Sequence, residues 1–62
     1  MKLRERRELY GMSLKQAAKI LGISNSLLSM IENGKRVATV KVAKRICKFY
    51  GMTLDELYED VS

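Results

Sequence analysis

Side chains that could perform chemistry are few in this sequence of 62 residues. It has no histidine and a single cysteine, Cys47, so it offers neither a zinc site, nor a cysteine–histidine catalytic pair, nor an internal disulfide. Four of its seven carboxylates lie together in residues 51–62. Without a convincing set of acid, base and nucleophile, we expect no enzyme activity, cofactor, metal or small-molecule substrate. We expect Cys47 to be a small buried hydrophobic residue.

Charge is the stronger chemical signal. Twelve basic and seven acidic residues give a net charge of +5, which favours a polyanion as the partner, either nucleic acid or an anionic membrane surface. All twelve basic residues lie in residues 1–50, whereas residues 51–62 are acidic. The C-terminal end of the chain should therefore repel the polyanion that the rest of the chain attracts. A membrane is the weaker choice, because the basic residues do not lie opposite a continuous face of aromatic and leucine side chains.

In a short segment, residues 22–36, all the charged side chains lie near the C-terminal end. Its outward positions carry Asn25, Ser26, Ser29 and Met30. Glu32 comes late, and the cations Lys35 and Arg36 follow Gly34. Small neutral side chains on an outward face are usually solvated, so this pattern alone does not predict a binding site.

Length and composition predict one soluble domain over residues 1–62. The basic N-terminus is not followed by an apolar run, so it does not resemble a signal peptide. No stretch approaches the roughly 18 apolar residues of a transmembrane helix. Together with the unpaired cysteine, these features predict a cytoplasmic protein.

Glycines divide the chain into helices. Each glycine follows a segment that can be helical, where a left-handed residue ends a helix, and a serine or threonine that can cap the next helix comes within five residues. The glycines are Gly11, Gly22, Gly34 and Gly51, and the caps are Ser13, Ser24, Thr39 and Thr53. The pattern predicts an all-α fold with five helices, over roughly residues 2–10, 13–21, 24–33, 39–50 and 53–60.

The helix over 39–50 should be the central packing element. Its apolar residues fill about half of the helix surface, which is more than one neighbouring helix needs. They are Val40, Val42, Ala43, Ile46, Cys47, Phe49 and Tyr50. We expect the edge of this arc, Val42 and Phe49, to face either the helix over 53–60 or a second subunit.

The segment over about 13–33 has the spacing of a helix-turn-helix. Only Gly22 and Ile23 separate its two helices, and a glycine makes the tight turn in this motif. Ala18 is the small residue where the helices approach each other. Leu28 and Ile31, with Ile23, should form the apolar contacts that fix their angle.

At this level the chain resembles the lambda repressor and Cro-like helix-turn-helix proteins, the xenobiotic-response-element family of bacterial and phage regulators. The matching residues are Arg7, "GMS" at 11–13, Ala18, "LGIS" at 21–24, Leu28, "IENGK" at 31–35 and "GMTLDEL" at 51–57. The resemblance implies a compact five-helix lambda-repressor-like domain and a sequence-specific regulator of transcription that binds double-stranded DNA. It also implies a repressor that binds a palindromic operator as a dimer. The alternative is a protein-interaction module of antitoxin or antagonist type with the same fold.

The resemblance implies that the helix over 24–33 lies in the major groove and reads base edges. The implied base contacts are Asn25, Ser26, Ser29, Met30 and Leu27. Asn25 can pair with N6 and N7 of adenine, and Met30 can pack on a thymine methyl group. Leu27 either meets a thymine methyl group or packs at the edge of the helix. Because this helix has no arginine that could hydrogen-bond guanine, we expect a half-site rich in A·T pairs and some readout of DNA shape.

Basic residues beside this helix are the implied phosphate contacts, which supply affinity without sequence information. The set is Lys15, Asn33, Lys35, Arg36 and Lys41. Relatives often place a phosphate-contacting glutamine where this chain has Leu14, so Lys15 or backbone amides should substitute there. For Lys41, and for Lys44, Arg45 and Lys48, a solvated lysine or arginine remains the alternative.

Further expectations concern the contacts of the first helix and a surface for a second copy of the chain. Family members commonly join Glu32 to an arginine of the first helix, here Arg7, as a structural ion pair. Arg6 departs from the family pattern, because many relatives have an apolar residue there. The candidate dimer surface is Leu54, Leu57, Tyr58 and Val61, with Val42 and Phe49. For Leu54 and Leu57 the favoured role is to close the core, whereas Tyr58 and Val61 are freer to meet a partner.

Overall fold

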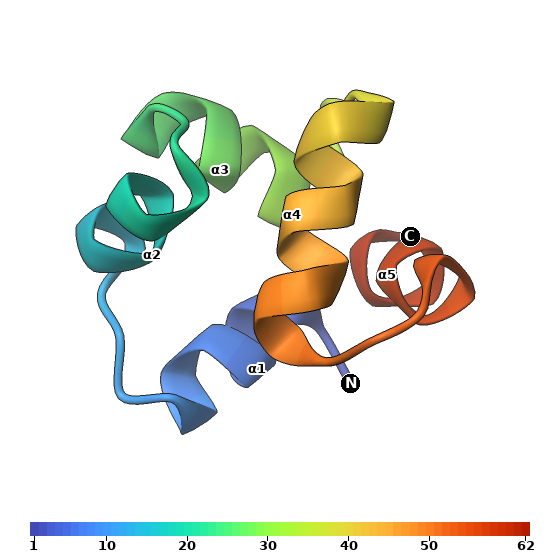
Figure 1. Ribbon diagram of the computed structural model, residues 1–62, viewed down its shortest axis with the longest axis horizontal. Coiled ribbons are helices and arrows are strands. Elements are labelled where there is room, and N and C mark those ends of the chain that lie inside the picture. Colours follow the sequence, from blue (N-terminus) through green and yellow to red (C-terminus); the bar gives the residue numbers. More distant parts are fainter.

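The computed structural model describes residues 1–62 as five helices without a strand (Figure 1). The helices are α1 (Leu3–Leu9), α2 (Leu14–Leu21), α3 (Asn25–Glu32), α4 (Val40–Tyr50) and α5 (Leu54–Val61). The predicted all-α class and five-helix order are confirmed. Every boundary lies within one residue of its predicted position. Apart from the end of α5, the differences arise because the predicted ranges counted the capping residues as helical.

Four helices begin at the predicted caps. The side chains of Ser13, Ser24, Thr39 and Thr53 each accept a hydrogen bond from the backbone N–H three residues later. In α2 the Gln16 side chain accepts the Ser13 N–H in return at 2.8 Å, and in α5 Glu56 does the same for Thr53 at 2.9 Å. These bonds satisfy amides that have no partner inside the helix, so the helix starts are encoded locally.

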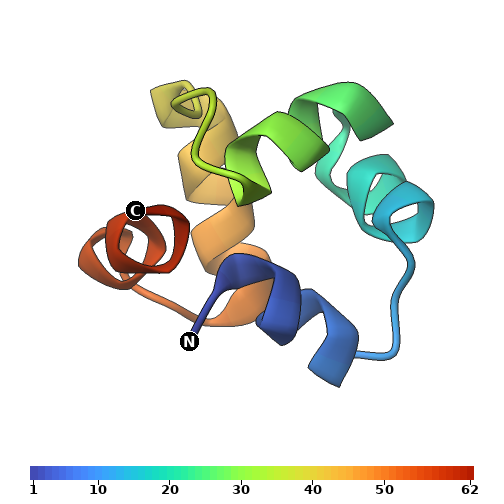
Figure 2. The ribbon, with the colours of Figure 1, turned by 180° about the vertical axis from the view of Figure 1, so that it is seen from behind.

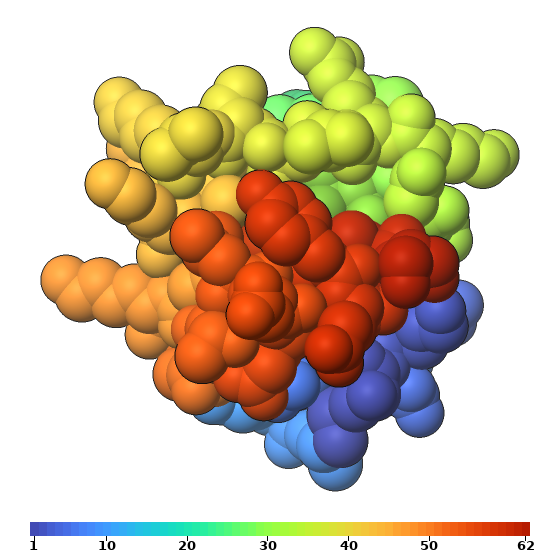
Figure 3. All heavy atoms as spheres, turned by 90° about the vertical axis from the view of Figure 1, so that its right-hand side faces the viewer, coloured from blue at the N-terminus to red at the C-terminus, as the bar shows by residue number.

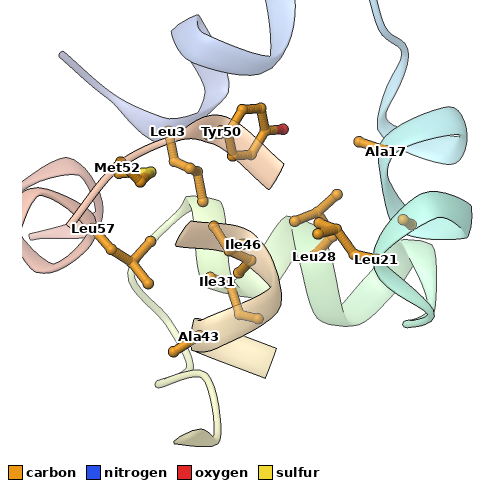
Figure 4. Close-up of a cluster of buried hydrophobic side chains, with 11 residues drawn as sticks. Leu3, Ala17, Leu21, Leu28, Ile31, Ala43, Ile46, Tyr50, Met52 and Leu57 are labelled. Atoms are coloured by element: carbon orange, nitrogen blue, oxygen red, sulfur yellow. The ribbon is translucent and has the colours of Figure 1, made fainter. Parts of the chain in front are cut away.

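The hydrophobic core draws side chains from all five helices (Figure 4). Its largest fully buried members are Leu3, Leu21, Leu28, Ile31, Ile46 and Leu57. Seen from behind, α1 and α3 lie in front of α4, which also packs against α2 and α5 (Figure 2). The expectation that the fourth helix is central agrees with this arrangement.

The apolar arc of α4 is not buried along its whole length. Val40 is 71% exposed, because it lies in the first turn of α4, beyond the end of the core. Cys47 is half-buried against the core, and this burial raises the pKa of its thiol. Phe49 packs its ring on Tyr10 and Tyr50, with ring centroids 5.7 and 4.9 Å away. Its aromatic neighbours therefore come from the end of α1 and from α4 itself.

The acidic C-terminal helix lies against the basic N-terminal helix. Arg6 Nε lies 2.6 Å from Asp60 Oδ2, and Arg6 Nη2 lies 3.5 Å from Glu56 Oε2. Asp60 is buried. Arg6 thus supplies an ionic contact between α1 and α5, and it pairs with two of the four acidic residues of α5.

None of the five helices has both the length and the hydropathy that a membrane-spanning segment requires.

Candidate nucleic-acid interface

The turn between α2 and α3 sets the angle at which α3 is presented. Gly22 ends α2 in the left-handed conformation, with φ of 71°. The next residue, Ile23, donates its backbone N–H to the carbonyl of Ala18 at 3.0 Å, which closes the end of α2. Leu28 and Ile31 are buried, so the inner face of α3 is fixed on the core. The opposite face of α3 is left outside.

Arg45 of α4 braces the same turn. Its Nη1 donates a hydrogen bond to the Leu21 carbonyl at 3.3 Å and lies 3.1 Å from where a Cβ would stand at Gly22. A cation suits this place because the carbonyls at a helix C-terminus carry partial negative charge. One signal for this role is visible in the sequence, because Arg45 lies four residues before Phe49, at the edge of the apolar arc.

The outer surface of α3 carries no charge before Glu32. Asn25 and Ser26 are exposed, whereas Ser29 and Met30 are half-buried. Leu27 packs half-buried against the core, so the structure favours its packing role. Ser24 is already used as the helix cap. Short neutral side chains of this kind can approach base edges without an electrostatic bias of their own.

Glu32 does not bring a free negative charge to this surface. Arg7 Nε and Nη2 donate to its two carboxylate oxygens at 2.8 and 3.2 Å, and Arg7 Nη1 donates to the Met12 carbonyl at 2.9 Å. Both side chains are buried. The hydrogen bond to Glu32 raises the pKa of the Arg7 guanidinium. The pair joins α1 to the end of α3, and the third bond joins it to the segment before α2.

The expected phosphate-contacting residues lie at the ends of helices around α3. Lys15 is exposed in the first turn of α2, and Lys41 is exposed in the first turn of α4. Asn33, Lys35 and Arg36 are exposed in the loop that follows α3. None of these four cations forms an ion pair within the chain. Their charge therefore remains available for an external anion.

Comparison with known proteins decides the family. The helix-turn-helix family model matches residues 3–57, which is nearly the whole chain. This chain belongs to the helix-turn-helix family of Cro and lambda repressor type. The predicted resemblance is confirmed, and the chain is a DNA-binding transcription regulator by family.

Curated relatives of this helix-turn-helix regulator agree with that assignment. An uncharacterised helix-turn-helix-type transcriptional regulator of Methanocaldococcus jannaschii is 36% identical over 61 residues, which cover 95% of this chain and 92% of the relative. The helix-turn-helix-type transcriptional regulator PuuR of Escherichia coli is 30% identical over 59 residues. That match covers 95% of this chain but only 32% of PuuR. No solved structure matches the chain significantly.

In this helix-turn-helix regulator, Leu57 does not belong to the candidate dimer surface but has the core role favoured for it, whereas Leu54, for which the core was also favoured, is exposed. Leu57 is only 2% exposed, because it points from α5 into the core, so it can contribute little contact area to a partner. Tyr58 is 53% exposed, Leu54 is also exposed, and Val61 is half-buried. Val42 and Phe49 are both half-buried against the core.

The structure adds a feature that sequence reasoning missed. Val37 and Ala38, in the loop after α3, form a shallow groove with Tyr58 and Val61 of α5, and we call it the α5 groove. Val37 is 80% exposed. The loop and α5 lie side by side in the space-filling view (Figure 3). The available signal in the sequence was an apolar residue, Val37, directly after two cations in a segment expected to be a loop.

Proposed function

We propose that this helix-turn-helix regulator reads a specific sequence in double-stranded DNA with α3 and represses transcription by occupying that operator. The observation that carries the proposal is the distribution of charge around α3. Its exposed residues Asn25 and Ser26 are neutral, and the unpaired cations Lys35 and Arg36 follow the helix. A neutral reading face bordered by cations matches the polarity of a DNA groove bordered by phosphates.

The burial of Arg7 and Glu32 supports the same assignment. A carboxylate at the end of α3 would repel a phosphate backbone if it were free. The bidentate contact with Arg7 cancels that charge while holding α1 against α3. The surface offered to DNA is therefore neutral at its centre and positive at its edges.

For base reading, Asn25 is the strongest candidate, because its side-chain amide can donate a hydrogen bond from Nδ2 to adenine N7 and accept one at Oδ1 from the adenine N6 amino group. Ser26 and Ser29 can bond either kind of base, and Met30 can meet a thymine methyl group. We expect the half-site to be rich in A·T pairs, with part of the discrimination supplied by DNA shape.

Dimeric binding to a palindrome follows from the size of one reading helix. A single α3 touches few base pairs, and each mismatched pair costs about 1–3 kcal/mol, so two copies are needed for useful discrimination over a genome. The α5 groove is the surface that we assign to the second copy, because it is apolar and adjoins the loop that carries Lys35 and Arg36. Half-sites should then lie about 34 Å apart along the DNA, one helical turn. We place this activity in the cytoplasm.

Selection of binding sites from a random pool of duplexes tests the proposal. The expected result is an enriched palindrome, bound with an affinity that falls steeply as salt rises. A variant with both Lys35→Gln and Arg36→Gln should enrich the same sequence but bind it more weakly. If no sequence is enriched and binding does not depend on salt, the proposal fails, and the protein-interaction module becomes the better explanation of the exposed α5 groove.

A further inference from the structure

Two polar hollows meet on the outside of α1. One lies between α1, the start of α2 and the end of α3, and the other lies between α1, the loop after α3 and the C-terminal residues. Three residues line both hollows: Arg4, Glu32 and Asn33. Arg4 therefore stands beside the end of α3, next to the loop that carries the expected phosphate-contacting residues.

The other arginines of α1 are already engaged. All three donor nitrogens of Arg7 are engaged by Glu32 and by the Met12 carbonyl. Arg6 is held by Asp60 and Glu56 on α5. Neither guanidinium has its charge free for a ligand, so any anion bound in these hollows must find another cation.

Arg4 is that cation. Its side chain is 68% exposed, and its one ion pair within the chain is with Glu8, one helical turn later, at 3.7 Å. An exposed pair of this kind is weak and screened by salt, so an external anion can compete for the guanidinium. Lys2, which lines the second hollow, donates a hydrogen bond from Nζ to the Ser62 carbonyl at 2.8 Å.

We propose that Arg4 contacts a backbone phosphate of the DNA that flanks α3, with the exposed amide of Asn33 as its neighbour. This inference rests on the proposed function and extends the DNA-contacting surface from the helix-turn-helix to α1. Leu14 at the start of α2 also lines the first hollow and cannot hydrogen-bond a phosphate. The planar guanidinium of Arg4 can donate two hydrogen bonds to one phosphate, so it supplies on this side the contact that Leu14 cannot make.

Salt dependence of binding tests this assignment. Affinity for the duplex enriched by selection is measured over a range of salt for the wild type, Arg4→Gln and Lys19→Gln. Lys19 is exposed on α2 and lines neither hollow, so its variant is the control for the loss of one positive charge. Arg4→Gln should lower the slope of log affinity against log salt by about 0.9, the value for one phosphate contact, whereas Lys19→Gln should leave it nearly unchanged.

A second variant tests the same contact without removing the arginine. Glu8→Gln releases Arg4 from its ion pair, so it should tighten DNA binding in the wild type but much less in the Arg4→Gln background. Arg4 is exposed, so the melting temperature of Arg4→Gln should stay close to that of the wild type. An unchanged melting temperature excludes misfolding as the cause of a change in DNA binding. The inference is overturned if the slope for Arg4→Gln falls by less than half of the expected amount, or if Glu8→Gln weakens binding. If the wild type itself binds no duplex in a salt-dependent manner, the proposed function fails instead.

Discussion

Arg6 Nε lies 2.6 Å from Asp60 Oδ2, although the two residues are 54 positions apart in the chain. The contact fastens α5 to α1, and Glu56 adds a second carboxylate at 3.5 Å from the same guanidinium. Because α5 forms one wall of the α5 groove, the position of that groove depends on an ionic contact at the opposite side of α5. We therefore expect protonation of these carboxylates to loosen the wall that α5 forms.

Acid should weaken the attachment of α5 partly through Glu56. Hydrogen bonds from the backbone N–H and hydroxyl of Thr53, with the charge of Arg6, lower the pKa of Glu56 below its ordinary value of 4.5. The unfolded chain therefore takes up this proton first as the pH falls. The stability that Glu56 contributes is present above pH 4.5 and is lost as the pH falls through the lowered pKa. Melting temperatures of Glu56→Gln should depend less on pH in this range than those of the wild type. The Glu59→Gln variant serves as the control, and equal pH dependence in both would contradict the prediction.

Breaking the ion pair between Arg7 and Glu32 should destabilise the fold. The pair is buried, so a double-mutant cycle with Arg7→Met and Glu32→Gln should give a coupling energy of about 0.5–3 kcal/mol in urea unfolding. The exposed pair Arg4 and Glu8 is the control, with an expected coupling of about 0.3–0.5 kcal/mol. A coupling at Arg7 and Glu32 no larger than that of the control would show that the buried pair is not structural.

Substitutions of Asn25 and Lys35 should have separate effects, the first on the sequence specificity of DNA binding and the second on its affinity. Asn25→Ala should relax the preference at one base pair, with a loss of discrimination of about 1–3 kcal/mol, because an adenine contact is removed. Lys35→Gln should weaken binding to all sequences alike and lower the salt slope by about 0.9. Selection of sites with each variant, followed by titration at several salt concentrations, measures both effects. The opposite pattern would overturn the assignment of α3 as the reading helix.

The α5 groove should be needed for self-association. Val37→Glu and Tyr58→Glu each bring a charge into an apolar contact and should weaken dimerisation at least about tenfold, or about 1.4 kcal/mol. Both side chains are exposed, so the monomer should stay folded. Leu9→Glu makes the same change at an exposed residue of α1 and should have no effect. Sedimentation equilibrium and binding to a palindromic duplex measure the result, and unchanged association in both groove variants would exclude this surface.

Two glycines with the same backbone conformation should tolerate alanine differently. Gly11 and Gly34 both have φ of 69°, so alanine costs about 1–2 kcal/mol of strain at either position. At Gly11 a Cβ would meet nothing within 4 Å, but at Gly34 it would lie 2.5 Å from the Val61 carbonyl oxygen. Gly34→Ala should therefore lower the free energy of urea unfolding more than Gly11→Ala does. Equal losses would mean that Val61 moves aside without cost.

Local features of the fold were predictable from the sequence, because they depend on neighbours along the chain. Ser24 and Thr39 cap helices whose first amides lie three residues away, so their roles are visible in the sequence alone. The pairing of Arg6 with Asp60 is not visible in this way, because the choice of partner depends on how α5 crosses α1.

Helical periodicity also has a limit. It places Leu57 and Tyr58 in one apolar stripe, yet only Leu57 points into the core, since the direction of the core is fixed by the other helices. The exposure of Arg4 escaped prediction for the same reason. Three arginines occur within four residues of α1, and only the tertiary structure separates the two that contact other helices from Arg4, whose one ion pair is with Glu8 of the same helix.

The close approach of Gly34 to Val61 has a thermodynamic consequence. The loop that carries Lys35 and Arg36 rests directly on the end of α5, with no side chain between them. If the proposed second copy fixes the position of α5, it also fixes the position of Lys35 and Arg36, the proposed phosphate contacts. Linkage then requires reciprocity: the factor by which dimerisation raises the affinity for DNA is the factor by which DNA raises the affinity between the two copies. Such a protein could stay monomeric in dilute solution and assemble on its operator.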